Sequence, residues 1–266
     1  ELQMELLSLQ LKEGKPGGTF EWKNNGDVKT FAFNGQPSAR YIKLALTDAV
    51  GGFGSGRELY VFKVPGTESY LPGDINNDRL IDRNDLTSYI NYTGLKKGDA
   101  DFEGYISNGD INKNNIIDAY DISVVATQLE GGVGNNNVDQ VSGKIEISTS
   151  KQTYIKGEII EIKVKGIDLH SVNALGFALP YTSQDYEFES VKTVGTKAME
   201  NLTNDRLHTD GKKVLYPTFV NVGAKEMLNG TQELFIIKLK AKRNVKFDLK
   251  AVDGLLVDKK LKSVKF

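Results

Sequence analysis

Apolar and polar residues alternate near the start of the chain, over residues 18–33, 40–46 and 58–64. Successive side chains of a strand point to opposite faces of a sheet, so this alternation predicts half-buried strands. Pro65 and Gly66 then interrupt the pattern, as turn-forming residues do at a boundary. We therefore predict an all-β unit over residues 1–66.

The spacing of apolar residues becomes helical within residues 67–132. Leu86, Tyr89 and Ile90 share one predicted helical face, and Gly94 suits a C-terminal stop. The same spacing recurs later and also ends at a glycine: Ile122, Val125, Ala126, Leu129 and Gly131. The sequence thus predicts two short helices in this region.

The rest of the chain returns to alternation. Residues 133–142 are rich in Gly and Asn and are predicted to be a linker. Seven apolar-polar stretches follow within residues 143–266: KIEIS, IIEIKVKG, ALGFALPY, YEFESVKTV, LYPTFV, ELFIIKLKAK and FDLKAV. They predict an antiparallel β-sandwich. The predicted fold class is therefore a multidomain, mainly β chain with a small helical unit between two β units.

Charge is unevenly distributed along the chain. Residues 67–132 contain 12 acidic and 5 basic residues, a net charge of −7, although the whole chain carries only −1. Residues 143–266 contain 21 basic and 15 acidic residues, a net charge of +6. We hypothesise that these two units pack against each other, because the short linker keeps their effective concentration high. We expect neither nucleic acid as a partner nor a membrane span.

One stretch of twelve residues occurs twice, as DINNDRLIDRND at 74–85 and DINKNNIIDAYD at 110–121. Each copy has Asp or Asn at positions 1, 3, 5, 9 and 12, and a backbone carbonyl is available at position 7. The predicted ligands of the first copy are Asp74, Asn76, Asp78, Leu80, Asp82 and Asp85. Those of the second copy are Asp110, Asn112, Asn114, Ile116, Asp118 and Asp121.

Six or seven hard oxygen ligands on a curled loop are the donor set of Ca²⁺, so we predict two calcium sites. We expect Ile81 and Ile117, at position 8, to pair across the two loops. Asp- and Asn-rich turns also form for backbone reasons alone, but two copies matched at every ligand position argue against that reading. Residues 99–110 offer a further possible loop, for which we favour a solvated linker.

The two loop–helix copies resemble the duplicated calcium-binding unit of dockerin modules, EF-hand-like pairs that end each loop in Asp and bind cohesin partners. The resemblance implies a cohesin-like or dockerin-like protein as partner. The sequence departs from the family at position 6, where glycine is usual and Arg79 and Asn115 stand here. It departs again at positions 10 and 11, where small hydroxyl residues are common in the family and this chain has Arg83-Asn84 and Ala119-Tyr120.

The flanking units carry weaker resemblances. YIKGEIIEIKVKGI, VNALGFALPYTSQDYEFESV and TQELFIIKLKAK are similar to a cohesin-like, Ig-like β-sandwich. ARYIKLALTDAVGGFGSGRELYVFKV resembles the C-terminal part of a discoidin, or factor V/VIII type C, domain, a family that often binds glycans. Chains that combine these modules are extracellular bacterial glycoside hydrolases, so the resemblance implies a secreted parent enzyme acting on polysaccharides.

Catalytic motifs are not found in the sequence. His170 and His208 lie in no metal-binding motif and are predicted to be at the surface, and the chain has no cysteine. We therefore interpret the chain as a non-catalytic, calcium-stabilised association region. The alternative is a glycan-binding adhesin that recognises sugars through residues 1–66.

Overall fold

The computed structural model describes residues 2–5, 19–22, 45–49, 71–129, 140–223 and 225–266. The chain divides into two compact units, residues 1–68 and 69–266. In the first unit, three antiparallel strands form a sheet of order β2-β1-β3. These strands are β1 (Leu2–Glu5), β2 (Thr19–Trp22) and β3 (Ala45–Ala49). The strand predicted over residues 58–64 and most of the linker predicted over 133–142 lie outside the described residues.

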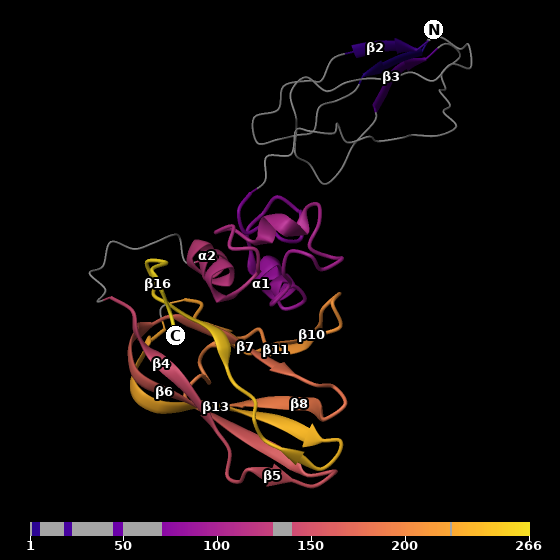
Figure 1. Cartoon of the computed structure of the whole chain (residues 1–266). Helices are drawn as coiled ribbons and strands as arrows, with labels where there is room; N and C mark the ends of the chain where they lie inside the picture. Colours follow the sequence, from indigo (N-terminus) through magenta and orange to yellow (C-terminus); the bar gives the residue numbers. More distant parts are fainter. Residues whose placement is uncertain (1, 6–18, 23–44, 50–70, 130–139, 224) are drawn as a thin grey trace. The chain divides into compact units, whose positions relative to one another are not determined.

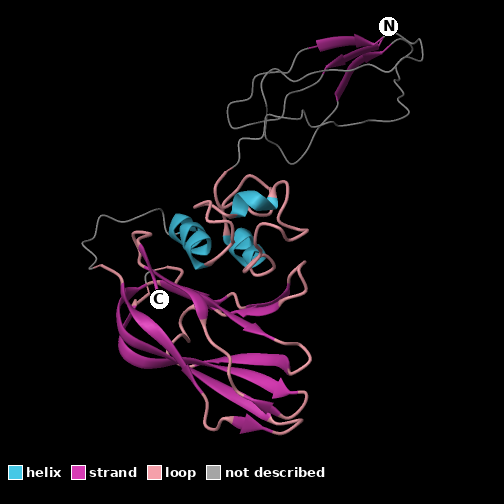
Figure 2. Ribbon diagram, viewed as in Figure 1, coloured by secondary structure: helices cyan, strands magenta, loops and turns pink. Residues whose placement is uncertain are grey.

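Residues 71–129, here called the helical module, contain two α-helices and a short 3₁₀ helix (Figures 1 and 2). These elements are α1 (Arg83–Tyr89), η1 (Ile106–Gly109) and α2 (Ala119–Leu129). Each α-helix begins three residues before the predicted start, inside the repeated twelve. The reason is capping, because the Asp82 side chain accepts from the Asn84 N–H and starts α1 within the loop.

Residues 141–266, here called the sandwich module, form two main sheets. One has the order β4-β6-β13-β8, made of β4 (Ser142–Ser148), β6 (Ile159–Val172), β13 (Leu228–Ala241) and β8 (Tyr186–Thr193). The other is centred on β7 (Ala174–Tyr181), with β10 (Asn204–Leu207), β11 (Lys213–Tyr216), β12 (Thr218–Val220), β9 (Glu200–Asn201), β15 (Val252–Val257) and β16 (Ser263–Lys265). A small ladder joins β5 (Thr153–Tyr154) to β14 (Val245–Lys246).

Six of the seven stretches predicted as strands in this module form them. The exception is FDLKAV, because residues 247–251 make no ladder and β15 begins only at Val252. Its alternation is nevertheless real, since Phe247, Leu249 and Ala251 pack against the core between the sheets. An alternating pattern indicates burial on one side, and a segment can have that burial without forming a continuous ladder with a neighbouring strand.

The two main sheets differ in how many of their faces are covered. Residues of β6 alternate between buried and exposed over most of the strand, so that sheet turns one face to solvent. All residues of β7 except Pro180 are buried. Leu175, Phe177 and Leu179 belong to the core between the sheets. The residues between them must therefore be covered from the other side.

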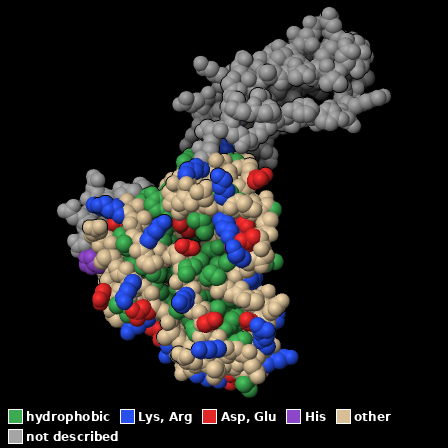
Figure 3. All heavy atoms as spheres, in the orientation of Figure 1, with side chains coloured by type: hydrophobic (Ala, Val, Ile, Leu, Met, Phe, Trp, Pro, Cys, Tyr) green, Lys and Arg blue, Asp and Glu red, His purple; other side chains and the backbone are tan. Residues whose placement is uncertain are grey.

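The mainly β fold class with a small helical region is as predicted from the sequence. Among the described residues, none of the helices has the length and apolarity needed to cross a membrane. On the face drawn in Figure 3, basic and acidic side chains are interspersed, so this face of the sandwich module carries no patch of one sign.

Candidate calcium loops and the contact between modules

The first loop is curled around its own carboxylates. Asp74 accepts backbone N–H bonds from Asp78 to Oδ1 (3.0 Å) and from Arg79 to Oδ2 (2.9 Å). Asp85 closes the loop, because its Oδ2 accepts from the N–H of Asp82 at the start of α1 (2.9 Å). Loop side chains also accept from the N–H groups of Ile75, Asp78, Leu80 and Asn84. Local backbone groups therefore hold each oxygen-bearing side chain in place.

The second loop repeats these bonds at the same positions. Asp110 accepts from Asn114 (3.0 Å) and Asn115 (2.8 Å), and Asp121 accepts from Asp118 (2.9 Å). The remaining N–H donors are again those of positions 2, 5, 7 and 11: Ile111, Asn114, Ile116 and Tyr120. Positions 4 and 6 have left-handed backbone in both loops, with φ of 59° at Asn77, 67° at Arg79, 59° at Lys113 and 74° at Asn115. The repetition in sequence is thus a repetition in geometry.

The last aspartate of each loop is fully buried. Burial raises the pKa of the Asp85 carboxyl. Burial raises the pKa of Asp121 well above its ordinary value, and the negative charge of Asp118 raises it further. The pKa of Asp118 is raised as well, again mainly by burial. Several carboxylates crowded into a buried loop repel one another, and a bound divalent cation relieves this repulsion.

The donor chemistry of both loops fits Ca²⁺, since every predicted ligand offers a hard oxygen atom. The first loop has four carboxylates and the second has three, with Asn114 in place of the fourth. Within the described part of the chain, no group of three or more His, Cys, Asp or Glu side chains is gathered closely enough to hold a metal ion. The carboxylates are instead turned to backbone N–H groups, and the twelve ligand assignments stay a prediction.

The two loops do not pair with each other in the way expected. The backbone of Ile117 pairs instead with the segment between the copies, through Gly94 N–H to Ile117 O (2.8 Å) and Ile117 N–H to Leu95 O (2.9 Å). Ile81 and Ile117 meet only as members of one hydrophobic cluster. This segment, residues 91–100, therefore joins the second loop and not the first.

Helix α2 packs against the outer face of β7, β12 and β15 in the sandwich module (Figure 1). Ala174, Gly176 and Ala178 point outward from β7, alternating with its core residues. A Cβ built on Gly176 would lie 3.3 Å from the Cβ of Ala119, the first residue of α2. Small residues on both surfaces let the helix approach the sheet closely.

One hydrophobic cluster spans both modules. The helical module contributes the following buried residues: Ile75, Leu86, Tyr89, Leu95, Phe102, Ile117, Ile122, Val125 and Ala126. The sandwich module contributes Ala174, Leu202, Val220, Leu255 and Val257. Residues 69–266 accordingly form a single compact unit.

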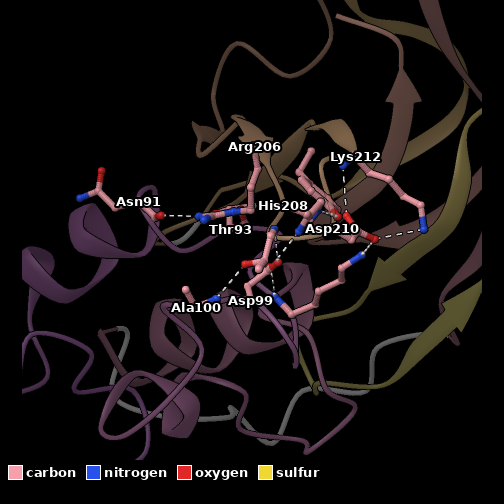
Figure 4. Close-up of polar contacts among 11 residues, drawn as sticks. Asn91, Thr93, Asp99, Ala100, Arg206, His208, Asp210 and Lys212 are labelled. Carbon is pink, nitrogen blue, oxygen red and sulfur yellow. Dashed lines mark hydrogen bonds and ion pairs between the residues drawn. The ribbon is translucent and has the colours of Figure 1, made fainter.

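A polar contact lies beside this cluster, between residues 91–100 and the β10–β11 hairpin (Figure 4). Arg206 donates through Nε to the carbonyl of Thr93 (3.3 Å) and through a terminal nitrogen to that of Asn91. These carbonyls follow the end of α1, which has no basic residue in its last turn. The sandwich module thus supplies the positive charge that favours a helix C-terminus.

His208 is the centre of the same contact. Its Nδ1 lies 2.7 Å from Oδ2 of Asp99, and its Nε2 lies 2.8 Å from the hydroxyl of Tyr216. The other oxygen of Asp99 accepts from the N–H of Thr209 (3.1 Å), and Ala100 donates to the Thr209 hydroxyl (2.9 Å). Burial and the charge of Asp99 raise the pKa of the Tyr216 hydroxyl.

One prediction about these residues is wrong, and a second is wrong in part. His208 is 3% exposed and not a surface residue, because the helical module covers the hairpin that carries it. The prediction of a solvated linker is wrong only in part, because Asp99, Phe102, Gly109 and Asp110 are buried whereas Ala100, Asp101, Glu103 and Gly104 are exposed. The oxygens of Asp99 are used by Lys96, His208 and Thr209. Sequence reasoning missed the burial of His208 and of Asp99, because these two partners lie 109 residues apart in the sequence.

Comparison with known proteins supports part of this description. The family model of the dockerin type I domain matches residues 72–130. No curated protein gives a significant match. The dockerin match indicates a module for protein–protein association, and such modules are non-catalytic.

The chain is also similar to solved structures of cohesins. One is a cohesin module from a Clostridium perfringens family 33 glycoside hydrolase (11% identity, TM-score 0.38, covering 47% of this chain and 90% of that chain). A second is a type II cohesin domain from the cellulosome of Acetivibrio cellulolyticus (14%, 0.36, 46% and 88%). A third belongs to a type I cohesin–dockerin complex from Clostridium thermocellum (14%, 0.34, 45% and 90%). The comparisons thus find similarity to a dockerin type I domain over residues 72–130 and to cohesin structures over 45–47% of the chain.

Proposed function

We propose that residues 69–266 form a non-catalytic association region in which the dockerin-like helical module is docked on the cohesin-like sandwich module of its own chain. The observation that carries this proposal is the seating of α2 on β7. Seven of the eleven residues of α2 are buried, against three of the seven in α1. The outer residues of β7 are as small as the helix residues that meet them.

The polar contact supports the same proposal. The Nδ1 atom of the buried His208 has its partner, Asp99, only when the two modules are together. Separation would leave the carbonyls of Asn91 and Thr93 without Arg206. Buried polar groups with partners on the facing module fix one relative orientation, because any other arrangement leaves them unpaired.

Calcium has a structural role in this proposal. Without it, the carboxylates of each loop repel one another, and helices of this length are marginal alone. A site filled at a calcium concentration of about one hundred times its dissociation constant adds about 2.7 kcal/mol of stability. The twelve loop residues named above would supply the ligands of two ions.

Docking within the chain is tested by backbone ¹⁵N relaxation of the full chain with calcium. We expect residues 71–129 and 141–266 to share one rotational correlation time. Ser123→Arg should separate them, because Ser123 is fully buried on α2. Thr87→Arg is the matched control, since Thr87 has the same place in the first copy and is exposed. Independent tumbling of the two modules in the unaltered chain would refute docking.

We further propose that this region belongs to a secreted bacterial glycoside hydrolase. The support is the combination of module types, with dockerin-like and cohesin-like partners acting in polysaccharide degradation. In this proposal residues 1–66 bind glycans, and most of these residues lie outside the described part of the chain. The sequence of the full-length gene product tests this proposal, and a gene product without a glycoside hydrolase domain would rule it out.

A further inference from the structure

The two calcium loops have the same internal bonds but different surroundings. At position 7, the side chain of Ile116 packs against Ala178, Val214 and Tyr216 of the sandwich module. Leu80, at the same position of the first loop, is 50% exposed. One loop thus touches the neighbouring module at a predicted ligand position, and the other faces solvent there.

The second loop also borders a cavity of about 260 Å³ at the contact between the modules. Asn114 and Asp118 line it from the loop, and Gly176, Asp253 and Lys265 line it from the sandwich module. Three of the predicted ligands of the second loop, Asn114, Ile116 and Asp118, therefore share a cavity with charged groups of the other module.

Tyr216 connects the same loop to the segment between the copies. A Cβ built on Gly94 would lie 2.1 Å from its ring, so the ring occupies the space that a larger residue would need. Gly94 has a φ of 79°, and its N–H is bonded to Ile117 of the second loop. The second loop, residues 94–97 and the β11 strand therefore form one packed set.

We propose that calcium binding at the second loop is coupled to docking of the two modules, whereas the first loop binds calcium independently of docking. This inference rests on the proposed function, since it assumes both docking and calcium binding. Ile116 links the two events, because its backbone carbonyl is the predicted ligand and its side chain contacts the sandwich module. Coupling between binding events is reciprocal, so docking must raise calcium affinity at this loop by the factor that calcium raises docking.

Calcium titration calorimetry of the full chain tests whether a change in the sandwich module alters the calcium affinity of the second loop. Asp110→Asn leaves only the first site intact, and Asp74→Asn, its positional match, leaves only the second. Val214→Ala removes packing against Ile116 without touching either loop. We expect it to weaken calcium binding about fivefold or more in the Asp74→Asn background. Binding in the Asp110→Asn background should be unchanged.

Val164→Ala is the matched control for a general loss of sandwich stability. Val164 is fully buried in β6, in the sheet remote from the helical module, and should leave both calcium affinities unchanged. An equal loss at both sites after Val214→Ala, or a loss at neither, would overturn the coupling. So would an effect of Val164→Ala as large as that of Val214→Ala.

Hydrogen exchange of the full chain measures the reverse effect, that of calcium binding on the contact between the modules. With calcium, Asp110→Asn should speed amide exchange in β11 and in residues 91–100, while Asp74→Asn should affect its own loop and α1 only. If both variants keep the two modules tumbling together with native exchange in β11, docking stands and the coupling fails. If the unaltered chain tumbles as two bodies, the proposed function itself has failed.

Discussion

The two copies of the repeated twelve have the same internal hydrogen bonds and yet lie in different environments. Positions that hold the loop together are the same or similar in both, whereas positions that meet the rest of the molecule differ. Position 10 is Arg83 in the first copy, exposed, and Ala119 in the second, buried. Position 14 changes from exposed Thr87 to buried Ser123. The repeat therefore determines local geometry, and the positions at which the two copies differ decide which helix docks.

The comparison extends to the pKa of the last aspartate of each loop. Asp85 and Asp121 accept the same backbone N–H bonds, but the pKa of Asp121 is raised further above its ordinary value. At both residues burial is the first cause of the raised pKa, and at Asp121 the neighbouring charge of Asp118 is the second cause. A bound cation would relieve this cost in both loops.

Removal of calcium is the test with the largest expected effect. If each site is filled at about one hundred times its dissociation constant, EDTA should lower the free energy of unfolding by about 5 kcal/mol in total. Differential scanning calorimetry in calcium and in EDTA measures the change. A melting temperature that ignores EDTA would contradict calcium binding at both loops, and a loss of half that size would mean that one loop alone binds.

Exchange of the residues at position 10 tests whether the second copy docks through its small side chains. Ala119→Arg places a charged side chain against Gly176 and should cost about 3 kcal/mol, as an unpaired buried charge does. Arg83→Ala removes an exposed ion pair to Glu200 at 3.2 Å and should cost less than about 1 kcal/mol. Urea unfolding with calcium present measures both. A similar loss in the free energy of unfolding for both variants would show that the difference in burial at position 10 does not affect stability.

Much of the fold could be predicted because its signals are local. The alternation of β6 and the helical spacing around Ile122 lie within single elements, and the repeated twelve fixed both loops. The apolar spacing places the start of α1 three residues late, because that spacing gives no sign that the Asp82 side chain caps the helix. Alternation also misled at Phe247, where burial occurs without a strand.

The contact between modules could be predicted only in outline. The opposite charges of the two regions suggested it, but the structure uses small residues of α2 and a few specific pairs. Nothing near His208 in the sequence points to Asp99, which lies 109 residues earlier. A buried polar contact depends on the tertiary arrangement, and a single sequence without that arrangement gives no period or spacing to detect it.

The polar contact provides a third and smaller test. His208→Gln should leave Asp99 with a weaker side-chain partner and cost about 2 kcal/mol. Burial alone would raise the pKa of Asp99, but backbone bonds from Lys96 and Thr209 and the contact with His208 outweigh it and lower the pKa. A lowered acid pKa gives stability that is complete above the ordinary value of about 3.9 and is lost as pH falls through the lower, folded-state value.

The variant should therefore unfold at a higher pH than the unaltered chain when acid is added, because less of that lowering remains. Acid titration followed by circular dichroism measures the shift. Lys212→Gln is the control, since it removes an exposed charge from the same hairpin without contacting Asp99. An unchanged acid midpoint in His208→Gln would mean that the histidine does not stabilise the Asp99 carboxylate.

The smallest expected effect separates the two loops at position 6. Arg79 and Asn115 both have left-handed backbone, with φ of 67° and 74°. A long side chain pays about 1–2 kcal/mol for this conformation, whereas Asn adopts it readily. Glycine removes the strain but also makes the unfolded chain more flexible, which offsets part of the gain. Arg79→Gly should therefore raise stability by about 1 kcal/mol in calcium, and Asn115→Gly should change it little. Equal thermal shifts in the two variants would mean that the second loop is as strained as the first, and the difference between the copies would then lie in their surroundings alone.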